Sequence, residues 1–454
     1  MHDNTMNKLE MRAIWGLGTV FSLRMLGMFT VLPVLTTYGI VFKGANHTLI
    51  GIAIGIYGLA QAMFQIPFGL ISDRIGRKQL IVGGLLIFAI GSVIAAVTNS
   101  IWGIILGRAL QGSGAISSVV MALLSDLIRE QNLTKSMAFI GVSFGVNFAL
   151  AMILGPIIAH TFGIHVLFWI IAVLAITGIV ITLTIVPSAN NYILNRHANI
   201  IRGGFNKVLM NIALLKLNIS IMCLHALLMS IFVVLPLVME KAGLVVSEHW
   251  KIYLGTMLVS FITAVPAIIY AERYRCMKQI FIGCIIMLFC AEVLLWLSGY
   301  HLWGIITGVQ LFFMAFNIME TILPSWISKE SPAGYKGTAM GAYSTSQFIG
   351  VAIGGILGGW LYSLQGSELV FIVGSLIIVF WLLISNTMKD PLYASNLRIK
   401  ISMLTAQDSM LENFLNSQPG VIEAIVVPEE QCIYIKADMK YTNRSELEAI
   451  INSR

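Results

Sequence analysis

The chain has 454 residues, of which 57% are hydrophobic and only 11% are charged, and its mean hydropathy is +0.87. Soluble domains carry about 25% charged residues, so this composition excludes an ordinary soluble globular protein. The net charge of +7 does not indicate a nucleic-acid partner, because the basic residues fall in short clusters between apolar runs.

Twelve apolar runs follow one another along the chain, and each is long enough to form a helix across a bilayer, which takes about 20 residues. The first run is too long for a cleaved signal peptide, so we expect it to be retained. The sequence therefore predicts an all-α polytopic membrane protein. The expected helices are 13–42, 49–72, 79–97, 101–127, 136–162, 164–186, 212–239, 250–271, 277–297, 302–328, 337–364 and 369–388.

The two halves of the chain resemble each other at an offset of 200 residues. Lys78-Gln79 matches Lys278-Gln279, and Gly155 matches Gly355. Repeats of this kind form two pseudo-symmetric six-helix bundles with a substrate cavity at their interface, near the middle of the bilayer. We expect an N-terminal bundle at 1–187, a linker at 188–211, a C-terminal bundle at 212–390 and a further small domain at 391–454.

The basic residues define the expected orientation in the membrane. The connections that would lie on one side hold 16 Lys and Arg residues, against 3 on the other. Cytoplasmic loops carry the excess of Lys and Arg, so we expect both termini to be cytoplasmic, in a bacterial inner membrane.

The connection between the second and third expected helices combines glycines with charges: Gly69, Asp73, Arg74, Gly76, Arg77 and Lys78. It resembles the signature loop of the major facilitator superfamily. The resemblance implies that Asp73, Arg77 and Asp126 form a cytoplasmic latch against the start of the eleventh helix, near Gly337, and favour the outward-open state. The alternative is a solvated basic loop that only sets topology.

Two further stretches resemble motifs of the same superfamily. Arg108, Gly112 and Gly114 resemble a motif of its proton-coupled members, and Gly155-Pro156 resembles the motif of drug–proton antiporters. In the latter, Ala151 and Ala159-His160 replace glycines of the family pattern. Small residues at these positions let helices pack closely, which is the structural alternative to a direct functional role.

Ionisable residues are rare inside the apolar runs, and each is a candidate for function. We expect Glu320 to carry the coupled proton, with His225 as a second titrating group. Arg108 stays protonated and would bias a nearby acid, and Arg24 would bind an anionic group or hold Glu320. Satisfied structural hydrogen bonds are the alternative for these residues, and they are the favoured interpretation of Glu292. Tyr57, Asn317 and Tyr343 are candidates to line the substrate cavity.

The residues after Met388 change in character, since charges become frequent and apolar residues alternate. Strands at 397–401, 421–427 and 432–437 and helices at 407–416 and 445–451 predict a ferredoxin-like βαββα domain. It resembles metal-chaperone modules but lacks their paired cysteines, so we expect no metal and no other cofactor.

Together these features predict a monomeric secondary transporter that exports small, amphipathic solutes in exchange for protons by alternating access. The alternatives are a proton-coupled uptake symporter and a membrane sensor that signals through the C-terminal domain. An enzyme is disfavoured, because no serine–histidine pair, metal cluster or aspartate pair has a catalytic spacing. Removal of residues 396–454 separates the main alternatives: a sensor would lose its output and a transporter would keep most of its flux.

Overall fold

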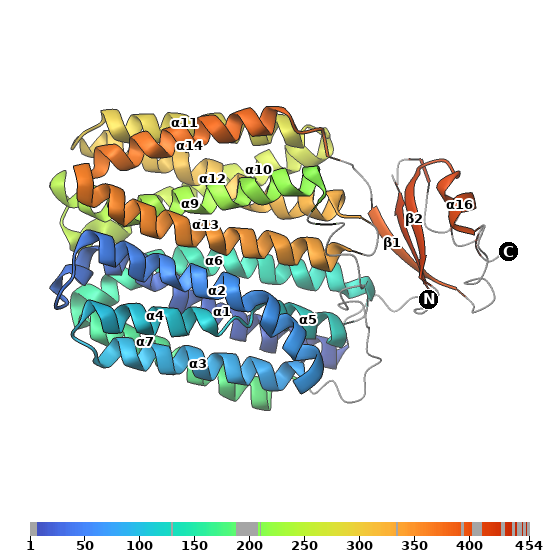
Figure 1. Ribbon diagram of the computed structural model, residues 1–454, viewed down its shortest axis with the longest axis horizontal. Coiled ribbons are helices and arrows are strands. Elements are labelled where there is room, and N and C mark those ends of the chain that lie inside the picture. The colour runs from blue at the N-terminus through green and yellow to red at the C-terminus, as the bar shows by residue number, and fades with distance from the viewer. Residues whose placement is uncertain are drawn as a thin grey trace.

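The computed structural model describes residues 7–128, 130–187, 208, 210–332, 335–391, 395–401, 411–427, 432–437, 441–442, 447 and 451. Within these residues, twelve helical spans are long and apolar enough to cross a membrane, which confirms the predicted polytopic fold. Long helices run side by side in two groups, and a small domain lies beyond one end of them (Figure 1). The linker falls largely outside the described residues.

The first group of helices is formed by the N-terminal half. Its span at 101–127 is divided into two helices, although the sequence predicts one, because Gly114 leaves the helical region with a ψ of 54°. The helices are α1 (Lys8–Tyr38), α2 (His47–Ile75), α3 (Arg77–Val97), α4 (Ile101–Ser113), α5 (Ser117–Leu127), α6 (Glu130–Phe162) and α7 (Ile164–Thr184).

The second group is formed by the C-terminal half, and its first helix is capped by the side chain of Asn211, which accepts from two backbone N–H groups. Such a cap satisfies donors that the first turn of a helix leaves free. The helices are α9 (Ile212–Lys241), α10 (His249–Arg273), α11 (Met277–Leu297), α12 (Leu302–Glu330), α13 (Lys336–Gln365) and α14 (Ser367–Asn386).

The two bundles have a basic end, with the loops at 76, 128 and 274–276, and a far end, with the loops at 39–46, 98–100, 242–248 and 298–301. At the far end they touch closely. A Cβ atom at Gly51 of α2 would lie 2.5 Å from the carbonyl oxygen of Gly355 of α13. Glycine is therefore required there, because only its backbone can approach a neighbouring helix so closely.

Further contacts close the far end between the bundles. The Thr36 hydroxyl of α1 donates to the carbonyl of Phe232 in α9 (3.1 Å), and Thr48 donates to Ser363 (2.9 Å). Toward the basic end, α2 and α13 diverge (Figure 1). A Cβ atom at Gly69 of α2 or at Gly337 of α13 would have no described atom of the opposite bundle within 4 Å. The bundles are thus joined at the far end and separated at the basic end.

The C-terminal domain is a three-stranded antiparallel sheet of β1 (Ser395–Lys400), β2 (Val421–Val427) and β3 (Cys432–Ala437), with the helix α16 (Leu411–Asn416). The strand order β1-β3-β2 places β3 between two mutually parallel strands. This is the split arrangement of the predicted ferredoxin-like fold. The predicted helix at 445–451 lies almost wholly outside the described residues.

One described hydrogen bond joins this domain to the helices. Lys436 of β3 is 3% exposed, and its amine donates to the carbonyl of Ser331, the residue that follows α12 (3.2 Å). Burial lowers the pKa of the Lys436 amine, while the carboxylates of Glu330 and Glu423 act in the opposite direction. The domain therefore contacts the end of the helix that carries Glu320.

Candidate functional site

A small cavity lies between the bundles, and residues near the middle of α9 (Ile212–Lys241) and α13 (Lys336–Gln365) line it. Helices α1, α2 and α4 supply one wall, and α9 and α13 supply the other. The lining is mainly apolar and aromatic, with one arginine, one histidine and one glutamine. Its residues are Met28, Phe29, Leu32, Ile54, Tyr57, Arg108, His225, Met229, Gln347, Phe348 and Val351.

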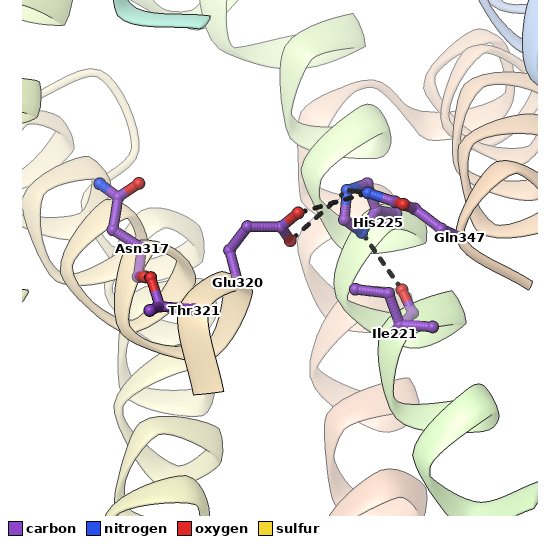
Figure 2. Close-up of polar contacts among 6 residues, drawn as sticks. All are labelled: Ile221, His225, Asn317, Glu320, Thr321 and Gln347. Atoms are coloured by element: carbon purple, nitrogen blue, oxygen red, sulfur yellow. Dashed lines mark hydrogen bonds and ion pairs between the residues drawn. The ribbon is translucent and has the colours of Figure 1, made fainter. Parts of the chain in front are cut away.

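Glu320 of α12 reaches toward His225 of α9, and Gln347 of α13 lies beside both (Figure 2). The Gln347 amide nitrogen is 2.8 Å from His225 Nε2 and 3.3 Å from Glu320 Oε1. Glu320 Oε2 lies 3.7 Å from His225 Nε2. Three helices of the C-terminal bundle thus meet at one acid, one imidazole and one amide.

The partners of His225 define its hydrogen positions. Its Nδ1 lies 3.3 Å from the carbonyl of Ile221, which can only accept, so Nδ1 carries the hydrogen. The Nε2 of the neutral ring then accepts from Gln347, whose second amide hydrogen is directed at Glu320. A proton on Nε2 would oppose the Gln347 donor and favour Glu320 Oε2 instead. One proton therefore changes which helices are bonded together.

The side chain of Glu320 is 20% exposed, whereas that of His225 is 5% exposed. Glu320 lies ten residues before the end of α12, or about 15 Å from the basic end at 1.5 Å per residue. Its Oε2 atom has no hydrogen-bond partner within the described residues. The Glu320 side chain is thus the more exposed of the two, and its buried Oε2 atom has unused capacity for a proton.

Two of the predicted cavity residues lie near this network without lining the cavity described above. Asn317 precedes Glu320 by three residues, and its side chain points away from the acid (Figure 2). Tyr343 precedes Gln347 by one helical turn and is 3% exposed. The Tyr343 hydroxyl and the Asn317 amide nitrogen have no hydrogen-bond partner in the described part of the chain.

Arg108 of α4 is 1% exposed and lies in the N-terminal wall of the cavity. Its Nη1 donates to Gln111 Oε1 (2.8 Å), and its guanidinium lies 4.6 Å from the centre of the Tyr57 ring. A cation over an aromatic face is attracted by the ring. The predicted residues Arg108 and Tyr57 are therefore brought together at one point.

Arg24 is also 1% exposed but is bonded within the N-terminal bundle. Its Nη2 donates to Gln61 Oε1 (2.5 Å) and its Nη1 to Ser117 Oγ (2.9 Å). The expected interaction of Arg24 with Glu320 is therefore wrong for this structure. The reason is that amide and hydroxyl acceptors on the adjacent helices α2 and α5 lie within reach.

The signature loop brings α2, α3 and α5 together at the basic end. Arg77 Nη1 lies 2.8 Å from Asp126 Oδ2, and each side chain is 11% exposed. Gly76 has a φ of 107°, which favours glycine, and it joins α2 to α3. Lys78 donates instead to the carbonyls of Val186 (2.8 Å) and Leu183 (3.3 Å) at the end of α7. The side chains of Asp73 and Arg74 lie outside the described residues.

The predicted packing glycines lie where helices approach one another. A Cβ atom at Gly112 would be 2.3 Å from the carbonyl oxygen of Tyr57, and one at Gly114 would be 2.3 Å from that of Gly84. A Cβ atom at Gly155, which precedes Pro156 in α6, would be 2.6 Å from the carbonyl oxygen of Thr30. These glycines hold α4 against α2 and α3, and α6 against α1, and thereby position Tyr57 and Arg108.

Glu292 of α11 is 1% exposed, and neither of its carboxylate oxygens has a hydrogen-bond partner among the described residues. It packs against Gly374 of α14, where a Cβ atom would lie 3.0 Å from the carboxyl carbon. Glu292 therefore lies away from the cavity described above, but the satisfied hydrogen bond expected for it is not found among the described residues.

Sequence reasoning missed the amides at Gln61, Gln111 and Gln347. Each bonds to a predicted ionisable residue and controls which of its atoms remain free. These residues could have been found in the sequence as glutamines inside apolar runs, since an amide buried in a membrane helix requires a hydrogen-bond partner.

Comparison with known proteins gives two family matches. The family model of the Major Facilitator Superfamily matches residues 17–354, and that of the YajR YAM domain matches residues 397–453. The inner membrane transport protein YajR of Escherichia coli (strain K12) is 60% identical over 451 residues, which is 99% of each chain. In the sequence alone, the stretch at 21–27 and the loop at 328–338 resemble YajR, and the identity over the full chain confirms that resemblance.

More distant similarities concern the helical part. The multidrug resistance protein MdtH of Yersinia enterocolitica is 25% identical over 348 residues, covering 74% of this chain and 83% of its own. The crystal structure of the nucleoside transporter NupG has a TM-score of 0.67 at 15% identity and covers 83% of this chain and 100% of its own. The structural likeness shows the fold.

Proposed function

The chain belongs to the Major Facilitator Superfamily and is a multi-pass membrane transporter, and from this premise we propose that it exports small molecules in exchange for protons. The observation that carries the proposal is the meeting of Glu320, His225 and Gln347 beside a cavity between two bundles. An acid inside a membrane bundle that can gain and lose a proton is a typical element of proton coupling.

The orientation follows from charge. The basic end holds most of the Lys and Arg residues of the loops, so we place it, both termini and the C-terminal domain in the cytoplasm. With this orientation, the contacts at the far end close the periplasmic side, and the divergence of α2 from α13 opens the cytoplasmic side. This is the state in which an exporter would load its substrate.

Protonation would couple to the conformational change through the three C-terminal helices. Uptake of a proton at Glu320 or His225 alters the bonds among α9, α12 and α13, and α13 is packed against α2 of the other bundle. A shift of a few kcal/mol between the two states is enough to change their populations strongly. The bundles would then rock about the central cavity, so that the far-end contacts open as the basic end closes.

We infer that transport is directed outward. Export is supported by the Gly155-Pro156 motif and by the similarity to MdtH, whose name describes multidrug resistance. Uptake by symport is the competing direction, since it uses the same acid and the same cavity.

The test is flux in proteoliposomes that contain the purified full-length chain. With an imposed pH gradient and a panel of amphipathic solutes, at least one solute should move against its concentration gradient and in the direction opposite to protons. Movement with the protons would replace antiport by symport. If the flux of every transported solute were the same with and without the pH gradient, proton coupling would be contradicted.

A second function, sensing through the C-terminal domain, is favoured by the contact between Lys436 and Ser331 at the end of α12. For a transporter, we expect removal of residues 396–454 to change flux by no more than about twofold, as surface changes away from a site usually have small effects. Loss of most flux would show instead that the domain is required for the cycle.

The docking contact itself has a milder test. Lys436→Met keeps the length of the side chain and removes the donor, so hydrogen exchange at residues 325–332 should increase while the fold of the domain is retained. Unchanged exchange there would show that this bond does not hold the domain against α12.

A further inference from the structure

The N-terminal wall of the cavity contains two buried donors with unused capacity. Arg108 and Tyr57 are each 1% exposed and both line the cavity. The Nε atom of Arg108 and the hydroxyl of Tyr57 have no hydrogen-bond partner in the described part of the chain. A buried donor without an acceptor costs about 1–3 kcal/mol, so an acceptor that enters the cavity would be stabilised.

A chain of hydrogen bonds holds Arg108 in place and uses the nearest acceptors. Ser92 donates to the carbonyl of Phe88 (2.7 Å), so its oxygen is left to accept from the Gln111 amide nitrogen (2.8 Å). The Gln111 oxygen must then face Arg108, whose Nη1 donates to it (2.8 Å). Arg108 is therefore held in a fixed position by Gln111, and the N–H groups that do not contact Gln111 remain available for another acceptor.

Among the described residues that line the cavity, no carboxylate could neutralise Arg108. None of its eleven lining residues is Asp or Glu. The described contacts of Arg108 are with Gln111 and the Tyr57 ring, while Glu320 belongs to the cluster with His225 and Gln347. A buried cation without a counterion is costly, and an anion within reach offsets that cost.

The rest of the cavity is suited to an apolar body. Met28, Phe29 and Leu32 belong to one wall, and Met229 and Phe348 to the other. Methionine and aromatic side chains adapt to flat or irregular apolar groups. A ligand of this site would thus combine one acceptor-rich charged group with a hydrophobic portion.

We propose that this site binds an amphipathic organic anion, whose carboxylate, sulfonate or phosphate accepts hydrogen bonds from Arg108 and Tyr57 while its apolar part packs between the two walls, which move apart from the arrangement described here to admit it. The inference rests on the proposed function, because it takes this cavity to be the transport site. It deepens that function by assigning the sign of the substrate's charge.

The test compares three probes with the same ring system and different charges: 2-naphthoate, 2-naphthamide and (2-naphthylmethyl)ammonium. Binding to the purified full-length chain is measured by isothermal titration calorimetry. The anion should bind about tenfold or more tightly than the amide, and the ammonium probe should bind most weakly. Equal or tighter binding of the ammonium probe would overturn the inference.

Matched variants locate the anion. Tyr57→Phe removes the hydroxyl of a residue that lines the cavity. Tyr253→Phe removes a hydroxyl in α10 that is equally buried and unpartnered among the described residues, but Tyr253 does not line the cavity. Naphthoate affinity should fall severalfold in the first variant and be unchanged in the second. It should fall about tenfold or more in Arg108→Gln, the usual loss when one partner of a buried charged contact is removed. Unchanged affinity in both Tyr57→Phe and Arg108→Gln would refute the site.

Binding and flux separate the two proposals. If naphthoate binds through Arg108 but its flux does not depend on the pH gradient, the proposal of proton coupling is contradicted and that of the anion site is supported. If the amide or ammonium probe is driven by the gradient while naphthoate neither binds nor moves, the anion site fails and proton coupling stands.

Discussion

Glu320→Gln should reduce gradient-driven flux by about tenfold or more, since coupling between two ligands is typically worth 5–150-fold in affinity and this variant cannot take up the proton. The glutamine keeps the shape of the side chain and can still interact with Gln347. Exchange of solute without a pH gradient should therefore persist. Both rates are measured in proteoliposomes, with gradient and exchange assays on the same preparation.

Glu292→Gln is the matched control, because it makes the same chemical change at another buried glutamate. Glu292 packs between α11 and α14 and has no described bond to the cavity network. Its variant should retain nearly all gradient-driven flux. Equal loss in the two variants would mean that any buried charge change impairs the fold, and full flux in Glu320→Gln would remove this acid from the mechanism.

The helices were predictable from sequence because a bilayer imposes a length and a polarity that apolar runs reveal directly. The strands at 421–427 and 432–437 agree with the structure in full. The interruption between α4 and α5 was not predicted, because the residues around Gly114 are small or apolar and suit a continuous helix as well as a break.

The candidate site was predicted in part, for a related reason. Glu320, His225 and Arg108 are conspicuous as rare ionisable residues in apolar surroundings. Their hydrogen-bond partners cannot be identified from the sequence, because His225 and Gln347 are 122 positions apart and meet only through the packing of α9 against α13. Arg24 was paired with an acid by charge alone, whereas proximity joins it to Gln61 and Ser117.

Asp126→Asn should shift the conformational equilibrium toward the state that is closed at the far end. Asp126 and Arg77 both belong to the N-terminal bundle and remain paired in this structure, in which the glycines at 69 and 337 do not touch the described part of the opposite bundle. The pair therefore shapes the loop rather than joining the bundles. We propose that it holds the loop ready to receive the start of α13 when the far end opens.

Because the pair is present in the state described here, its loss changes the equilibrium only by the difference between its contributions to the two states. We expect a difference of about 1 kcal/mol, part of the roughly 2 kcal/mol that a partly buried pair can contribute, which lowers the population of the far-end-open state by about fivefold. Spin labels at Val41 and Val245, exposed positions at the far end of different bundles, would report the change. Electron–electron double resonance should lose its longer distances in Asp126→Asn.

Glu248→Gln is the control for a change of net charge, because it removes a carboxylate from an exposed ion pair with Lys251. The Glu248 side chain is 45% exposed and that of Lys251 is 56% exposed. An exposed pair contributes about 0–1 kcal/mol, so this variant should leave the distance distribution nearly unchanged. A shift of the same size in both variants would show that the conformational balance responds to net charge, whereas a shift confined to Asp126→Asn ties it to the geometry of the loop. A gain of longer distances in Asp126→Asn would reverse the role of the pair and make it a lock on the state described here.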